Sequence, residues 1–136
     1  HIEDDRSALQ ECYNVLSPDG RLILTVPAYN WLWSGHDEAL GHQRRYLKTD
    51  LVNKFKNSGF DILFSSYAIT FLFPPIAVYR LLDWLRGRKQ EASYVTVPRL
   101  VNSFFTLSLF VEARLLKMGL HFPFGTSIII CARKPK

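Results

Sequence analysis

The sequence predicts a single α/β domain, because short apolar strands alternate along the chain with amphipathic helices. Three runs rich in branched apolar residues predict strands at 21–28, 60–68 and 126–133. Apolar residues at helical spacing predict a helix before each of the first two strands. Of the 136 residues, 48% are hydrophobic, so the chain can bury a real core and is not a disordered protein.

The first helix is expected from about Asp4 to Leu16, with acidic residues at its start opposing the helix dipole. "SPDG" (17–20) then predicts a type I turn. "RLILTVPA" (21–28) is apolar at almost every position, which is typical of a strand buried on both faces. A second helix is expected to begin with Thr49 as its N-cap and to end at Gly59.

Residues 69–122 differ from the rest of the chain. The segment is apolar, and it is interrupted by Pro74 and Pro75 and by a charged turn at 86–91. Residues 97–117 predict one long helix whose apolar core is too short to span a bilayer, which takes ~20 residues. We expect a helical insertion that either packs on the sheet as a hairpin or lies on a membrane surface.

Several motifs resemble the C-terminal half of class I methyltransferases that use S-adenosylmethionine. "HIEDDRSALQECYNVLSPDGRLILTVP" is similar to the end of that family's fourth strand, its next helix and its fifth strand, with Asp19 replacing a glycine of the turn. "SGFDILFSS" and "GTSIIICARKP" resemble the sixth strand and the final, antiparallel seventh strand. "WSGHDEALGHQRRY" resembles the subgroup called methyltransferase type 11 or 12. The resemblance implies strands five, six and seven of a Rossmann-like methyltransferase sheet, with a helical insertion at about 69–122, in one partial domain spanning 1–136.

The resemblance also implies S-adenosylmethionine as the cofactor, but the family's main cofactor motifs are missing. Its glycine-rich turn follows the first strand and an acidic residue ends the second, and no two glycines here form a GxG. Only His1 and Ile2 remain of the segment beside the cofactor's methionine end. Because the chain opens on His1 inside the family pattern, we expect ~90–110 residues to precede it in the natural protein. Alone, the chain is expected to be inactive.

The loop 29–47 follows the first strand, and ligands of open α/β sheets bind at the carboxyl ends of strands. His36, Asp37 and His42 can supply three metal ligands. However, the spacing is not that of HExxH, and Gly41 argues against a regular helix there. We therefore predict no metal site.

An acid/base role suits the loop better. Methyl transfer to a hydroxyl or an activated carbon requires that the acceptor lose a proton, and His36 or His42 can accept it. Asp37 or Glu38 would then fix the histidine tautomer. The expected substrate-binding side chains are two arginines with forked donors for an anion, a hydrogen-bonding tyrosine and an aromatic wall: Arg44, Arg45, Tyr46 and Trp33. One alternative is that Arg44 and Arg45 are solvated and His36 caps a turn. Another is a structural network that ties the loop to the next helix.

The sequence thus predicts S-adenosylmethionine-dependent methyl transfer to a small molecule, and the apolar insertion favours a lipid-like or isoprenoid-like acceptor. A non-catalytic interaction module and a fragment of a nucleic-acid methyltransferase are the alternatives. The net charge of +5 suits an anionic ligand, a nucleic acid or an acidic membrane surface. A nucleic-acid partner is not expected, because no long stretch interleaves basic residues with aromatics and no NPPY motif occurs.

Cellular setting and assembly follow from the cysteines and from the first strand. Cys12 and Cys131 form no CxxC pair, which excludes a zinc ribbon and indicates a reduced, cytoplasmic setting. Peripheral contact with the inner face of a membrane is expected through 69–122. Without the family's fourth strand, one edge of 21–27 has no partner, so the isolated chain is expected to form a homodimer through it.

Overall fold

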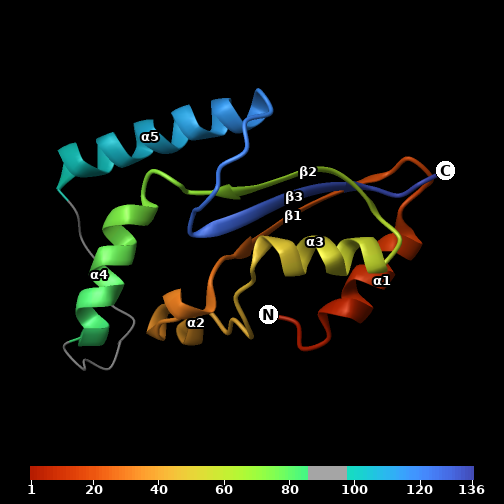
Figure 1. Ribbon diagram of the computed structural model, residues 1–136, viewed down its shortest axis with the longest axis horizontal. Coiled ribbons are helices and arrows are strands. Elements are labelled where there is room, and N and C mark those ends of the chain that lie inside the picture. Colours follow the sequence, from red (N-terminus) through yellow and green to blue (C-terminus); the bar gives the residue numbers. More distant parts are fainter. Residues whose placement is uncertain (86–97) are drawn as a thin grey trace.

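The computed structural model describes residues 1–85 and 98–136 (Figure 1). The elements follow in chain order: α1 (Asp5–Val15), β1 (Arg21–Pro27), the 3-10 helix η1 (Asn30–Leu32), α2 (Gly35–Ala39), α3 (Lys48–Asn57), β2 (Asp61–Ala68), α4 (Phe73–Leu85), α5 (Arg99–Lys117) and β3 (Ser127–Arg133). The predicted α/β class and all three predicted strands are confirmed. The charged turn expected at 86–91 lies outside the described residues.

The three strands form one sheet in the order β1-β3-β2, and β3 runs antiparallel to both neighbours. The last strand of the chain is therefore inserted between the first two, which run parallel to each other. The expected antiparallel final strand is confirmed. Because β1 and β2 are parallel, their carboxyl ends lie at the same end of the sheet, and the loop after β1 begins there.

The core lies between the sheet and the helices α1 and α3, which cover one face (Figure 1). Ile128, Ile130 and Ala132 alternate along β3 and are fully buried, so they point to the same face. They meet Leu9 of α1 and Phe55 of α3 in a single cluster. Burying a large apolar side chain contributes about 1.5–3 kcal/mol. These contacts hold α1 and α3 against the sheet. The loop after β1 extends from this packed part of the structure.

The expected burial of β1 on both faces is wrong. Burial alternates along β1, and Ile23 is 66% exposed because α1 and α3 pack on the other face. The expected N-cap of the second helix is also wrong by two residues. Leu47 occupies that position and accepts the N–H of Leu51 at 3.1 Å, so the helix starts without a side-chain cap.

The two prolines of the insertion begin a helix and do not interrupt one. Pro74 and Pro75 lie in the first turn of α4, where a missing N–H leaves no helical hydrogen bond unmade. Pro98 is the N-cap of α5. Within α5 only Glu112 is buried, so this helix does not pack along the sheet. None of the helices described is both long and apolar enough to cross a bilayer.

One edge of β1 is open, because β1 pairs with β3 alone. The loop after β1 covers only the carboxyl end of this edge. There the Tyr46 N–H donates to the Pro27 carbonyl at 3.0 Å, and the Tyr29 N–H donates to the Tyr46 carbonyl at 2.9 Å. Among the described residues, nothing pairs with the outer edge of 21–26. Such an apolar edge is a template for another strand.

We expect Thr25→Pro to prevent self-association of the 136-residue chain. The Ala28 N–H donates to Thr126 on the β3 side, and N–H groups alternate along a regular antiparallel pair. The Thr25 N–H therefore points to the open edge, and proline removes it without breaking a bond to β3. Sedimentation equilibrium should give a dimer for the wild type and for Thr25→Val, but a monomer for Thr25→Pro. A wild-type chain that stays monomeric at high concentration would contradict edge pairing.

Candidate functional site

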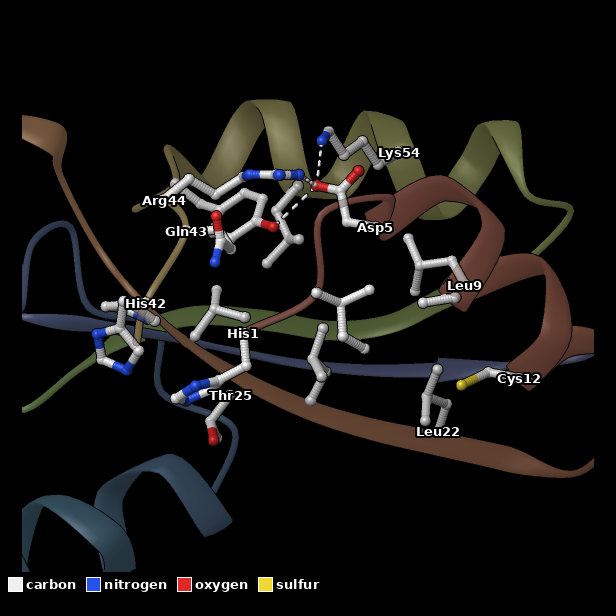
Figure 2. Close-up of a pocket in the computed structure, with 17 residues that line it drawn as sticks. His1, Asp5, Leu9, Cys12, Leu22, Thr25, His42, Gln43, Arg44 and Lys54 are labelled. Atoms are coloured by element: carbon white, nitrogen blue, oxygen red, sulfur yellow. Dashed lines mark hydrogen bonds and ion pairs between the residues drawn. The ribbon is translucent and has the colours of Figure 1, made fainter. Parts of the chain in front are cut away.

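A pocket of about 320 Å³ lies between α1, β1 and the loop that follows β1. Leu9, Leu22, Leu24 and Val26 provide much of its apolar wall. Its polar side chains come from the N-terminal segment, α1, β1, the loop and α3 (Figure 2): His1, Asp5, Thr25, His42, Gln43, Arg44, Tyr46 and Lys54. The sheet and two helices thus supply a largely hydrophobic floor, and the loop supplies half of the polar side chains.

The structure brings part of the predicted site together. His1, Ile2, His42, Arg44 and Tyr46 all line the pocket. Two further members of the predicted site, Asp37 and Arg45, contact His42 or one another behind the pocket wall. The remaining two do not belong to the lining: His36 is exposed on α2, and Trp33 is partly buried after η1.

The loop forms a short helix followed by a reversal, and this geometry positions His42. α2 begins after Ser34 and ends before Gly41, whose φ is +70°. Glycine adopts this left-handed conformation without steric cost. The reversal lets the backbone N–H of His42 donate to the Asp37 carbonyl at 2.9 Å. This reversal brings the His42 imidazole next to the Asp37 side chain.

Asp37 is a fully buried carboxylate with several donors. Arg45 contacts both oxygens, with Nε to Oδ1 and Nη2 to Oδ2 each at 2.9 Å. The Ser34 N–H and hydroxyl donate to Oδ2 at 2.9 and 3.1 Å. Burial acts to raise the pKa of Asp37, but the hydrogen bonds from Arg45 and then from His42 outweigh it and lower the pKa below its usual value. Asp37 therefore remains ionised at neutral pH.

The Asp37 carboxylate orients the His42 ring. Nδ1 of His42 lies 2.9 Å from Oδ1 of Asp37. Because an ionised carboxylate only accepts hydrogen bonds, Nδ1 is the donor in this contact, and in a neutral imidazole Nε2 is then the unprotonated nitrogen. The His42 side chain is 18% exposed and lines the pocket, and the His1 ring packs edge-on against it with centroids 4.7 Å apart (Figure 2). A base held by a third group is the arrangement that general-base catalysis uses.

Arg45 forms its hydrogen bonds with groups of the loop and of the end of β1. Its Nη1 donates to the Ala28 carbonyl at 3.0 Å, which ties Asp37 to the end of β1. Its backbone N–H donates to Oδ1 of Asn30 at 3.3 Å, and its side chain is only 11% exposed. The forked donors expected to bind a substrate anion are thus occupied at Arg45. Arg44 lines the pocket, where its guanidinium contacts Asp5 and the Glu3 carbonyl.

A second polar cluster closes the pocket around Asp5 (Figure 2). Lys54, Arg44 at 3.1 Å and the Tyr46 hydroxyl at 2.8 Å all contact Oδ2 of Asp5. Burial raises the pKa of Asp5, but the hydrogen bonds from Lys54, Tyr46 and Arg44 outweigh it and bring the pKa to about 2. Burial, followed by the bond to Asp5, raises the pKa of Tyr46 to about 12, so the phenol stays protonated. Two cations share one carboxylate, which leaves this side of the pocket positive.

The sequence pattern did not identify Asp5 and Lys54 as site residues. Asp5 was expected only to oppose the helix dipole, and Lys54 lies 49 positions away on another helix. No local spacing predicts such a pair. Among the described residues, no group of three or more His, Cys, Asp and Glu side chains is placed to hold a metal ion.

No protein-family model matches this sequence, and no curated protein matches it. Among solved structures, phosphoethanolamine N-methyltransferase 2 of Haemonchus contortus in complex with S-adenosyl-L-methionine is 17% identical with a TM-score of 0.46, over 100% of this chain and 31% of that chain. A second structure, in complex with phosphomonomethylethanolamine and S-adenosylhomocysteine, is 16% identical with the same TM-score and coverage. This chain spans 31% of the length of those proteins. Similarity at this level is too weak to assign a function.

We expect Arg45→Met to lower the free energy of unfolding by about 3–5 kcal/mol, because it leaves a buried carboxylate without its cationic partner. Arg44→Met is the matched control. It removes the adjacent arginine, whose side chain is 32% exposed, and should cost about 0–1 kcal/mol. Urea unfolding followed by circular dichroism compares the two variants. Equal losses would contradict the structural role of the Arg45–Asp37 pair.

Proposed function

We propose that the chain is the C-terminal part of an S-adenosylmethionine-dependent methyltransferase that acts on a small molecule, with His42 as its general base. One observation supports this most strongly: a buried, ionised Asp37 orients an imidazole that lines a pocket. The resemblance of the HIEDD segment and of the strands to that enzyme family supports methyl transfer as the reaction class.

The residues described fit one end of the proposed cofactor. His1 and Ile2, which the resemblance places beside its methionine part, line the pocket, and the His1 ring contacts the His42 ring. The glycine-rich turn and the ribose-binding acid have no counterpart in the sequence 1–136, so no residue here is assigned to the nucleoside part. We place those groups in a further part of the natural protein. When bound, the cofactor supplies an electrophilic methyl group on a sulfonium sulfur.

His42 is placed to accept the proton that the acceptor loses. A hydroxyl or an activated carbon of the acceptor would lose its proton to Nε2 of His42 as it gains the methyl group. The cofactor would supply that methyl group, its sulfur would keep the electron pair of the broken carbon–sulfur bond, and the imidazolium ring would carry the positive charge. Asp37, held ionised by Arg45, stabilises that charge through Nδ1–H.

The pocket favours an acceptor with an apolar body and a polar or anionic group. The floor of the pocket is formed by leucine and valine side chains of α1 and β1. Arg44 and Lys54 share the single carboxylate of Asp5. The excess positive charge attracts an anion, and the Tyr46 phenol lies beside it. A lipid-like or isoprenoid-like molecule with such a group meets both conditions.

We expect His42→Gln to lower turnover by ~10²–10⁴-fold, the usual contribution of a general base. His36→Gln is the matched control, because His36 lies exposed on the same loop outside the pocket. The assay follows release of S-adenosylhomocysteine by the natural full-length protein. The acceptors tested in this assay are small molecules with an apolar chain and a hydroxyl group or an activated carbon.

Turnover of an acceptor that falls in His42→Gln and stays near the wild-type value in His36→Gln supports the proposal. If both variants keep turnover while His42→Gln loses melting temperature, the Asp37–His42 pair only stabilises the loop. If no acceptor is methylated, the non-catalytic interaction module is the better account.

A further inference from the structure

α5 carries a stripe of exposed apolar side chains along one face. Leu100, Phe104, Leu107 and Val111 follow the spacing of a single helix face, and their exposed fractions are 86, 67, 61 and 44%. We call these four residues the α5 stripe. Figure 1 shows α5 on the opposite side of the sheet from α1 and α3. The stripe is therefore separate from the pocket.

The acidic groups of this region are turned into the protein. Residues 69–85 and 98–126 contain only two acids, Asp83 and Glu112, and both are buried, at 7 and 2% exposure. The Glu112 carboxylate accepts the backbone N–H groups of Thr70 at 2.7 Å and Phe71 at 3.2 Å, which anchors α5. The described surface of the insertion thus presents no carboxylate to solvent.

The exposed charges of α5 are all basic. Arg99 lies in its first turn, and Arg114 and Lys117 lie in its last turn. The guanidinium of Arg114 lies 5.1 Å from the centroid of the Phe110 ring on the flank of the stripe. Apolar side chains on one face with basic groups beside them are the composition of a helix that lies in a membrane interface.

α4 contributes a second exposed apolar face. Val78, Leu82 and Leu85 lie at successive helical turns and are 57, 43 and 65% exposed. Trp84 is 74% exposed, and an indole suits the boundary between headgroups and acyl chains because it is apolar with one polar N–H.

We propose that α5 docks flat on an anionic phospholipid surface, with the α5 stripe among the acyl chains and the basic side chains at the headgroup phosphates. Anionic headgroups supply the opposite charge that this region lacks. A second copy of the chain would instead bring the same basic side chains together. The docking surface lies outside the pocket, so it does not depend on the reaction assigned to His42.

Flotation with vesicles tests this docking on the 136-residue chain and on the natural full-length protein. Vesicles of phosphatidylcholine mixed with phosphatidylserine should carry the protein, pure phosphatidylcholine vesicles should carry less, and added salt should weaken binding. Phe104→Ser with Leu107→Ser should lower the affinity on the order of tenfold or more. Val15→Ser, at an apolar position on α1 that is 84% exposed, is the matched control and should bind as the wild type does.

A second pair of variants tests the role of the basic side chains by replacing two of them with neutral residues. Arg99→Gln with Lys117→Gln should lower the affinity for anionic vesicles by about fivefold per charge. Arg6→Gln with Lys56→Gln, on exposed positions of α1 and α3, changes the net charge equally and should bind as the wild type does. Circular dichroism confirms that each variant is folded.

Three results would overturn the proposal: no binding to anionic vesicles, binding that the stripe variant retains, or equal losses for the two charge variants. Self-association that is lost in the stripe variant but kept in Thr25→Pro would identify the stripe as a subunit interface instead.

Discussion

The ion pair between Arg45 and Asp37 is the interaction on which the geometry of the site depends. Arg45 joins the carboxylate to the Ala28 carbonyl at the end of β1, and Asp37 in turn holds Ser34 and His42. Burying two charges costs desolvation that such a pair only partly offsets, so the pair contributes more to position than to stability. Without Arg45, the Asp37 carboxylate would keep only its contacts to Ser34 and His42 and would lose its link to the end of β1.

The pocket and the insertion use charge in opposite ways. At the pocket, Asp5 is shared by Arg44 and Lys54, and a small positive excess remains inside a largely apolar wall. In the insertion, Glu112 and Asp83 are buried, and positive charge is left at the surface beside exposed apolar side chains. The proposed lipid-like acceptor and the proposed docking on a lipid surface are compatible, because an acceptor dissolved in a bilayer is reached most readily by a protein bound to it.

The sequence predicts local elements better than it predicts partners. Apolar runs bounded by turns locate the strands, but their periodicity does not show that the last strand lies between the first two. The start of α3 was misplaced because Leu47 caps it through its backbone alone. In the loop, composition predicts a histidine held by an acid but not which of two adjacent acids. That choice depends on the turn of α2 that buries Asp37 and leaves Glu38 exposed.

The tautomer of His42 tests the central claim most directly, because it reports the Asp37 contact without requiring a substrate. Long-range ¹H–¹⁵N correlation spectra of the histidine side chains, recorded where imidazoles are neutral, distinguish a protonated Nδ1 from a protonated Nε2. We predict that His42 carries its proton on Nδ1 and shows an unprotonated Nε2, while the exposed His36 shows the averaged pattern of a free imidazole. A His42 spectrum that matches that of His36, or one with the proton on Nε2, would contradict the account.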